Sequence, residues 1–316
     1  MKGIYPIAKP RQQGFFNVTD GYKLHYWLIG NPKGIPVVFL HGGPGAGFDK
    51  EHTRFFDPKK FNVLLFDQRG AGKSTPFAST ENNNTPKLVQ DIRVLARHFF
   101  GNRKFAIFGG SWGSTLALAY ALAYPETVSG MVLRGIYLCG EDESQEFFVT
   151  DSKKNYPDAY ERFIKPVPQK LRNNWRSIVR FYQKKFTSKE RDHFTKEWAR
   201  FEVSMLSLDF SEKYINESLR GDSYKSLSPL EAHFYINSCF MPRDYLIKNA
   251  HKLSGIPTRI VHGRFDHVCR PIDAWNLHKE IKGSKLFFVT AAHSASEPAM
   301  QEKLREQMDE IGRIIS

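Results

Sequence analysis

The sequence predicts an α/β fold in which a mainly parallel, doubly wound sheet is covered by helices on both faces. Two observations predict it: several short apolar runs show no alternation with polar residues, and helical patterns lie between these runs. Such runs are typical of strands that are buried on both faces, and their alternation with helices is typical of parallel sheets. The length of 316 residues fits one large domain or a core with an inserted module.

The chain begins with an expected antiparallel hairpin. Residues 15–18 lead into Asp20-Gly21, a dipeptide that favours a tight turn, and residues 22–28 then alternate in the manner of a strand. The buried strands are expected at residues 36–40, 63–66, 105–108, 131–133, 259–261 and 286–289.

Helical patterns occupy the intervals between these strands. One segment opens at residue 85, carries apolar residues at helical spacing and ends at Gly101. Another, at residues 115–124, is dense in Leu and Ala and ends at Pro125. These helices are expected to cover the sheet.

The alternation of strand and helix stops near Gly140. From there to about residue 250 the chain is rich in aromatic and charged residues at helical spacing, and strand character returns only at Ile256. We therefore predict a core formed by residues 1–140 and 251–316, with residues 141–250 inserted as a helical cap over the edge of the sheet.

Residues 109–113 read Gly-Gly-Ser-Trp-Gly and contain the pattern G-x-S-x-G. The pattern follows an expected strand and opens an expected helix, which is the setting of a nucleophile elbow. Gly109 and Gly113 supply the small neighbours that a strained serine requires. We predict a serine hydrolase of the α/β-hydrolase type with Ser111 as its nucleophile. The alternative is a glycine-rich loop that only joins a strand to a helix.

A serine nucleophile needs donors for the oxyanion of its tetrahedral intermediate. Residues 41–45 read His-Gly-Gly-Pro-Gly and follow the strand at 36–40, where this fold places one of the two amides. We assign the donors to the backbone amides of Gly43 and Trp112, the latter at the positive end of a helix. His41 precedes the nucleophile in the chain, so we interpret it as a residue that braces the loop.

The catalytic acid and base are expected in the order Ser, Asp, His. Asp266 and His293 each follow an apolar strand, and the carboxyl ends of strands carry the sites of open α/β sheets. We assign the acid to Asp266 and the base to His293. Four other residues compete for these roles. His262 lies within or at the end of a strand, His267 lies beside Asp266, and His278 lies in a helical stretch. Asp244 lies before the strand resumes.

Composition argues against several other classes of protein. The net charge is +13, but the bases are scattered singly or in pairs, so a basic surface is favoured over a nucleic-acid site. No run reaches the roughly 18 apolar residues of a membrane helix, and residues 1–11 lack the apolar region of a secretory signal. The three widely spaced cysteines fit neither a disulfide framework nor a zinc site. We expect a cytoplasmic protein that needs no metal or cofactor.

In its motifs the sequence resembles the proline iminopeptidases, a family of α/β hydrolases with a helical cap. The matching segments lie in family order at His41–Gly45, Asp67–Ser74, Gly109–Ala117, Val132–Ile136, Val261–Asp266 and His293–Pro298. The resemblance implies removal of an N-terminal proline, so peptides that begin with proline are the expected partners; neither nucleic acid nor membrane is expected. A broader aminopeptidase or amidase, an esterase, and a non-catalytic binding protein of this fold are the alternatives.

The resemblance also implies how the substrate is recognised. It places Glu202 and Glu231 of the cap at the substrate amine, and Tyr137, Tyr235 and Cys269 at the proline ring. The chain departs from the family in having Phe201 where tryptophan is usual, and tyrosines at two pocket positions where phenylalanine is usual. The alternative for the two glutamates is a pair of solvated acids on helix surfaces; for the pocket residues it is ordinary packing.

Overall fold

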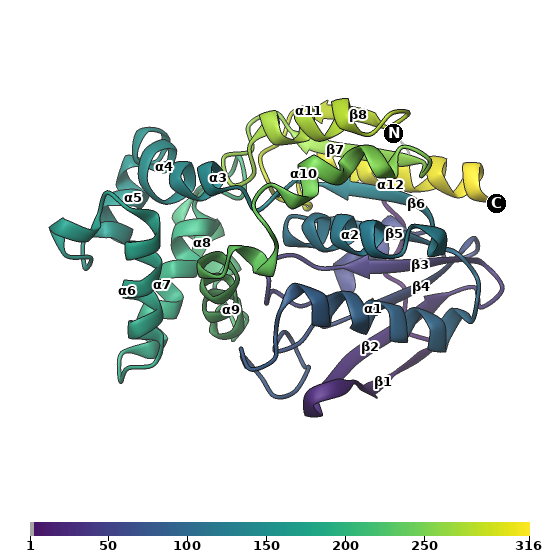
Figure 1. Ribbon diagram of the computed structural model, residues 1–316, viewed down its shortest axis with the longest axis horizontal. Helices are drawn as coiled ribbons and strands as arrows, with labels where there is room; N and C mark the ends of the chain where they lie inside the picture. The colour runs from purple at the N-terminus through teal and green to yellow at the C-terminus, as the bar shows by residue number, and fades with distance from the viewer. Residues whose placement is uncertain (1–2) are drawn as a thin grey trace.

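The computed structural model describes residues 3–316 and contains a sheet of eight strands in the order β1-β2-β4-β3-β5-β6-β7-β8 (Figure 1). β1 and β2 form an antiparallel hairpin, β2 is also antiparallel to β4, and the other neighbours are parallel. The predicted fold class is therefore confirmed. The strands are β1 (Gln12–Asn17), β2 (Lys23–Gly30), β3 (Ile35–Leu40), β4 (Phe61–Phe66), β5 (Phe105–Gly110), β6 (Val128–Arg134), β7 (Thr258–Gly263) and β8 (Lys285–Val289).

The apolar runs without alternation are explained by two cores, one on each face of the sheet. In β3, Val38 and Leu40 pack on one face, whereas Val37 and Phe39 pack on the other. Successive side chains of a strand point to opposite faces, so a sheet covered on both sides needs apolar residues at every position.

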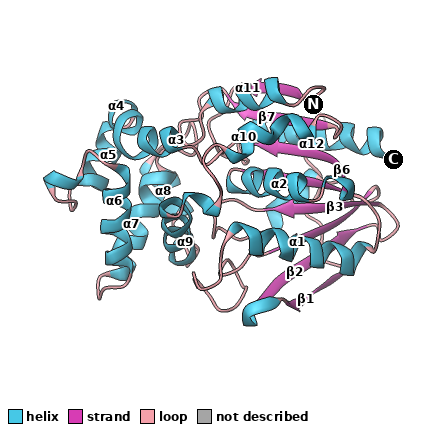
Figure 2. Ribbon diagram, viewed as in Figure 1, coloured by secondary structure: helices cyan, strands magenta, loops and turns pink. Residues whose placement is uncertain are grey.

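Helices cover both faces of the sheet (Figure 2). One core contains buried residues from α1 (Thr85–Phe100), α2 (Trp112–Ala123), α10 (Tyr245–Asn249) and α11 (Pro271–Glu280). The other contains residues from α12 (Pro298–Ile315) and the 3₁₀ helix at Lys50–Phe55. This arrangement leaves the ends of the sheet free for loops.

Between β6 and β7, every regular element of the chain is helical. We call the helices α3–α9 the helical unit; they are α3 (Glu141–Gln145), α4 (Asp151–Asn155), α5 (Pro157–Ile164), α6 (Trp175–Phe186), α7 (Arg191–Val203), α8 (Glu212–Ser218) and α9 (Tyr224–Ile236). They lie together at one end of the sheet (Figure 1). α10 then returns to the core, where it contacts α2 and α11.

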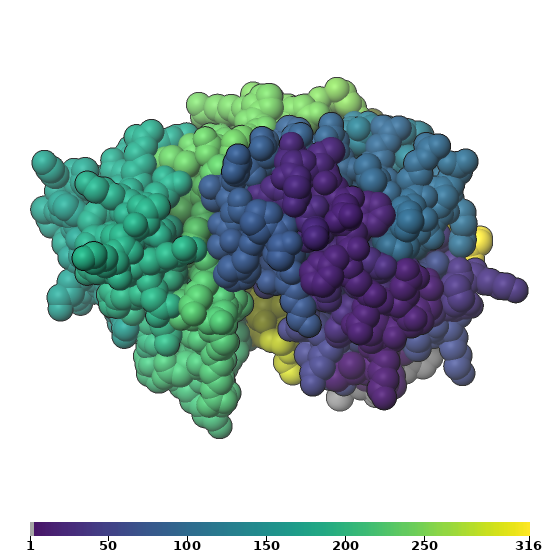
Figure 3. Space-filling view, turned by 90° about the horizontal axis from the view of Figure 1, so that it is seen from below, coloured from purple at the N-terminus to yellow at the C-terminus, as the bar shows by residue number. Residues whose placement is uncertain are grey.

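The helical unit has an aromatic core of its own. The rings of Phe163 and Phe201 stack with centroids 4.1 Å apart, and Trp198 packs edge-on to Tyr182 at 5.4 Å. Aromatic side chains bury a large apolar area each, which explains why this stretch of the sequence is aromatic-rich. In the space-filling view the unit and the core form two masses with a hollow where they meet (Figure 3).

Candidate active site

Ser111 lies in a tight turn between β5 and α2. Its backbone has φ 58° and ψ −129°, a left-handed φ that a residue other than glycine rarely adopts. The neighbouring chain is packed so closely that a Cβ on Gly109 would overlap the Gly113 carbonyl, and one on Gly113 would overlap the Leu40 carbonyl. The strained serine between two obligatory glycines is the geometry of a nucleophile elbow.

Asp266 and His293 form a buried pair at the ends of β7 and β8. The Nδ1 atom of His293 lies 2.8 Å from Oδ2 of Asp266, and Oδ1 of Asp266 accepts hydrogen bonds from the amides of Val268 and Cys269 at 3.0 and 2.8 Å. Burial opposes ionisation of Asp266, but the imidazole and the amides outweigh it and lower its pKa. An ionised aspartate in this position orients the imidazole and stabilises its protonated form.

The segment Arg134-Gly135, at the end of β6, connects the serine to the histidine. The Ser111 amide donates to the Arg134 carbonyl at 2.9 Å, and the Arg134 guanidinium donates to the His293 carbonyl. Gly135 lies directly against the imidazole ring. Among residues 3–316, no hydrogen bond involves Ser111 Oγ, so proton transfer from Ser111 to His293 stays a prediction.

The loop at residues 41–45 is held against the elbow through Gln68. The Gln68 side chain donates to the His41 carbonyl and accepts from the Trp112 indole at 2.9 and 2.8 Å, and its backbone amide donates to Nε2 of His41 at 2.9 Å. Burial lowers the pKa of His41 to about 4, so its imidazole is neutral at pH 7 and accepts the Gln68 proton. Sequence reasoning named His41 as a brace but missed Gln68, which lies within the matched segment 67–74.

The two amides assigned to the oxyanion lie on this braced pair of segments. Within residues 3–316 neither the Gly43 nor the Trp112 amide donates a hydrogen bond to the protein. A Cβ on Gly42 would lie 3.3 Å from Cβ of Ser111, so the loop passes directly beside the nucleophile. Amides that are unsatisfied and rigidly held are suited to receive a developing negative charge.

Glu202 of α7 and Glu231 of α9 lie beside one another where these two helices of the helical unit pack together. Glu231 is 2% exposed, and its Oε2 accepts a hydrogen bond from the Trp198 indole at 2.7 Å. Burial and the neighbouring Glu202 carboxyl raise the pKa of Glu231 well above its usual value, and burial also raises the pKa of Glu202. Glu231 is therefore not a solvated surface acid, and the half-buried Glu202 lies beside it. A cation that entered between these carboxyls would be strongly attracted.

Tyr235 lies next to the carboxyl pair, and Tyr137 packs against Tyr235. The rings of Tyr137 and Tyr235 meet at 60° with centroids 5.9 Å apart. Burial, together with Glu231 and Glu202, raises the pKa of Tyr235 well above its usual value, which places this ring beside the carboxyls. Cys269 is buried beside Asp266, and the Cys239 thiol lies 3.8 Å from the Tyr137 hydroxyl. Nothing in the sequence had pointed to Cys239.

Other features of the described residues bear on function. Residues 3–316 contain no group of three or more His, Cys, Asp or Glu side chains arranged to hold a metal ion. No helix in that range has the length and apolar character needed to cross a membrane. The three cysteines are free thiols.

Known proteins are similar to this chain in fold and in sequence. The alpha/beta hydrolase fold family matches residues 35–299. A probable proline iminopeptidase of Leptolyngbya boryana is 38% identical over 314 residues, which cover 98% of this chain and 97% of that protein. A proline iminopeptidase of Arabidopsis thaliana is 39% identical over 306 residues, or 95% of this chain and 80% of the plant protein. An esterase from Rhodococcus sp. ECU1013 matches 96% of this chain and 99% of its own with a TM-score of 0.68; at 16% identity it shows the shared fold alone.

Proposed function

This chain belongs to the proline iminopeptidases, a family of α/β hydrolases, and we propose that it releases N-terminal proline from peptides by acyl transfer to Ser111. The observation that carries the proposal is the pair of neighbouring carboxyls, the half-buried Glu202 and the buried Glu231, close to the Asp266–His293 pair. A hydrolase that acted on neutral esters would have no use for a buried acid beside a second acid at this place, because burying a carboxyl destabilises the fold.

The proposed chemistry has two steps. His293, oriented by Asp266, takes the proton of Ser111, and Oγ attacks the prolyl carbonyl while the amides of Gly43 and Trp112 hold the oxyanion. His293 then gives the proton to the departing amine, and the C–N bond breaks to leave a prolyl ester on Ser111. A water molecule, deprotonated by His293, attacks this ester; His293 then returns the proton to Oγ of Ser111 as the ester C–O bond breaks and proline is released.

Recognition of the amino terminus follows from the electrostatics of the carboxyl pair. The secondary amine of proline is protonated near neutral pH and would lie between Glu202 and Glu231, where one ionised carboxylate offsets its charge. Tyr137, Tyr235 and Cys269 would surround the pyrrolidine ring. A peptide extended upstream of proline has no charged amine at this point, so the pair would select for exopeptidase activity.

We also propose a functional division of the chain. Residues 1–140 and 251–316 would form the catalytic core, and residues 141–250 would form the cap that carries the amine-binding acids. The division places the nucleophile, the acid and the base on one part of the chain and the specificity on the other.

The decisive experiment compares three arylamides, namely those of proline, alanine and N-acetylproline. Rapid cleavage of the proline compound alone supports the proposal, whereas equal cleavage of the N-acetyl compound would identify a general amidase or esterase.

Ser111→Ala should lower kcat by a factor of about 10⁶ and abolish labelling by a fluorophosphonate. Glu202→Gln and Glu231→Gln should each lower kcat/KM for the proline compound; unchanged values in both would remove these residues from amine binding.

A further inference from the structure

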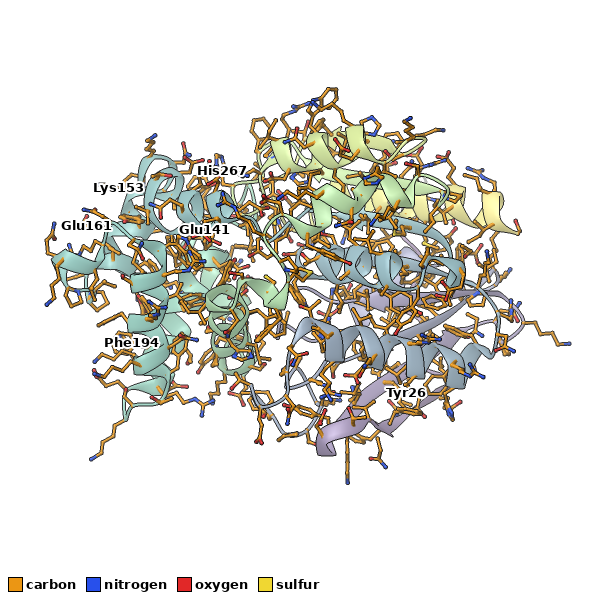
Figure 4. All side chains as sticks on the ribbon, in the orientation of Figure 1. Tyr26, Glu141, Lys153, Glu161, Phe194 and His267 are labelled. Atoms are coloured by element: carbon orange, nitrogen blue, oxygen red, sulfur yellow. The ribbon has the colours of Figure 1, made fainter. Side chains whose placement is uncertain are left out.

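A cavity lies between the helical unit and the loop that carries Asp266. Its volume is about 690 Å³, within the range of sites that hold small organic ligands. Much of its lining is apolar and aromatic, and includes Tyr156, Phe163, Phe201, Leu208, Phe210 and Phe265. His267, labelled in Figure 4, also lines it and lies where the helical unit meets the core.

Three apolar side chains of this cavity are exposed to an unusual degree. Leu208 is 46% exposed, Phe265 is 49% exposed and Phe210 is 67% exposed. Single exposed apolar residues are common, but several that gather around one hollow mark a binding surface. Phe210 and Leu208 come from the segment between α7 and α8, and Phe265 from the loop after β7, so the cavity is bounded by both parts of the molecule.

The wall of the cavity at residues 206–210 is hydrogen-bonded to the loop that carries His293. The Ser294 amide donates to the Leu206 carbonyl at 2.6 Å, directly after His293 in the chain. The Glu297 carboxylate accepts from the Ala292 amide at 2.7 Å and from the Leu208 amide at 3.0 Å. The segment that holds the apolar side chains is thus attached on both sides of the catalytic histidine.

This attachment indicates which part of a substrate reaches the cavity. The leaving amine must come within hydrogen-bonding distance of the imidazole that protonates it. The chain that follows this amine therefore passes over the loop of His293 and meets the segment at residues 206–210. The proposed function places the proline ring beside Tyr137, Tyr235 and Cys269, so only the downstream part of the peptide remains to be seated.

The charges of the cavity determine what it selects. The arginines of its described lining are Arg162 and Arg200, and each forms an ion pair, with Glu197 and Glu212 respectively. These ion pairs offset the charge that would attract a free C-terminal carboxylate, whereas the aromatic lining is suited to an apolar side chain.

We propose that this cavity binds the peptide downstream of the scissile bond and favours an apolar or aromatic side chain there. The inference rests on the proposed function, because it requires a prolyl peptide at Ser111. Leu208, Phe210 and Phe265 are specificity-determining residues in this scheme.

The test uses four substrates with amidated C-termini: prolinamide, Pro-Ala-Ala-NH₂, Pro-Phe-Ala-NH₂ and Pro-Ala-Phe-NH₂. Partial burial of a phenylalanine should raise kcat/KM for at least one phenylalanine peptide about tenfold over the alanine peptide. The double variant Leu208→Ser/Phe210→Ser should reduce this ratio to below about two. Both side chains are exposed, so the fold should tolerate the change.

Two controls separate the cavity from the catalytic site. Prolinamide ends at the leaving nitrogen, so its kcat/KM should be the same in the double variant and the natural protein. Phe15→Ser removes an equally exposed aromatic, 56% exposed and far from the cavity on β1, and should leave the tenfold ratio intact.

The inference would be overturned if the ratio of kcat/KM for the phenylalanine peptides to that for the alanine peptide were near one in the natural protein, or stayed tenfold in the double variant. Cleavage of prolinamide would in either case leave the proposed function standing. If none of the four substrates were cleaved, both the inference and the proposed function would be overturned. The inference would also be overturned if Pro-Ala-Ala with a free C-terminal carboxylate had a higher kcat/KM than either phenylalanine peptide. The cavity would then select charge.

Discussion

Replacement of Gly135 by alanine tests, with a single methyl group, whether the position of the His293 imidazole matters for the proposed catalysis. Gly135 has φ +53°, and a Cβ built on it would lie 2.9 Å from Cε1 and 3.1 Å from Nδ1 of His293. The optimum separation of two non-bonded carbon atoms is about 3.5–4.0 Å, so the ring would have to move by about 0.6–1.1 Å.

The imidazole cannot make this movement without losing a partner. Its Nδ1 is held 2.8 Å from Asp266, and the ring is buried. A misplacement of about 1 Å at a reacting group can lower the rate about 100-fold, which corresponds to about 2.7 kcal/mol of transition-state stabilisation. We therefore expect kcat/KM for a prolyl arylamide to fall about 100-fold in Gly135→Ala.

Gly283→Ala is the matched control. Gly283 also has a positive φ, +82°, but nothing lies within 4 Å of the position that its Cβ would take. Gly283→Ala should lose about 1–2 kcal/mol of unfolding free energy in urea, because alanine is forced into a left-handed conformation, and Gly135→Ala should lose at least as much because it also displaces the His293 ring. Only Gly135→Ala should lose activity beyond the fraction that is unfolded.

The reasoning would be refuted if Gly135→Ala kept the kcat/KM of the natural protein while losing stability as expected. That result would mean that the imidazole tolerates the displacement, or that His293 is not the catalytic base.

Three further predictions concern residues around the site. Trp198→Phe removes the donor that stabilises ionised Glu231, so the pKa of Glu231 should rise further and the acidic limb of the kcat/KM profile should move to higher pH; an unshifted limb would contradict amine binding by this carboxylate. Gln68→Leu leaves the Trp112 indole without its acceptor and should cost about 1–3 kcal/mol in urea unfolding and at least tenfold in kcat, whereas Gln68→Glu should preserve that acceptor. Burial raises the pKa of Glu143 from its usual 4.5 to about 8. Between these two pH values Glu143 is protonated in the folded state and ionised in the unfolded state. The unfolding free energy should therefore fall as pH rises from 5 to 8, by up to about 1.4 kcal/mol per pH unit, and Glu143→Gln should remove that part of the slope.

The elements of the core could be predicted because their signals are local. The run at 36–40 and the segment opening at residue 85 correspond to β3 and α1 within a residue or two. The elbow at Ser111 is also local, since it depends on a strand, two glycines and a helix that are consecutive in the chain.

The environment of the cap acids could not be predicted from the residues around them. Glu202 and Glu231 are separated by 28 residues, and each lies between two apolar residues in its helix. Only the packing of α7 against α9 brings the two carboxyls together and buries Glu231. The family resemblance pointed to the two positions, but the raised pKa values depend on burial that no short segment encodes.

The sequence by itself determined the strand and helix pattern and the elbow, and it predicted the order of nucleophile, acid and base along the chain. Hydrophobic periodicity and turn chemistry specify these because each acts over a few neighbouring residues. The tertiary structure alone decided that Gln68 joins His41 to Trp112, that Glu202 lies beside the buried Glu231, and that exposed apolar side chains from two distant segments bound one cavity. Hydrogen bonding, burial and charge coupling depend on which distant segments meet, and that is a property of the packed chain.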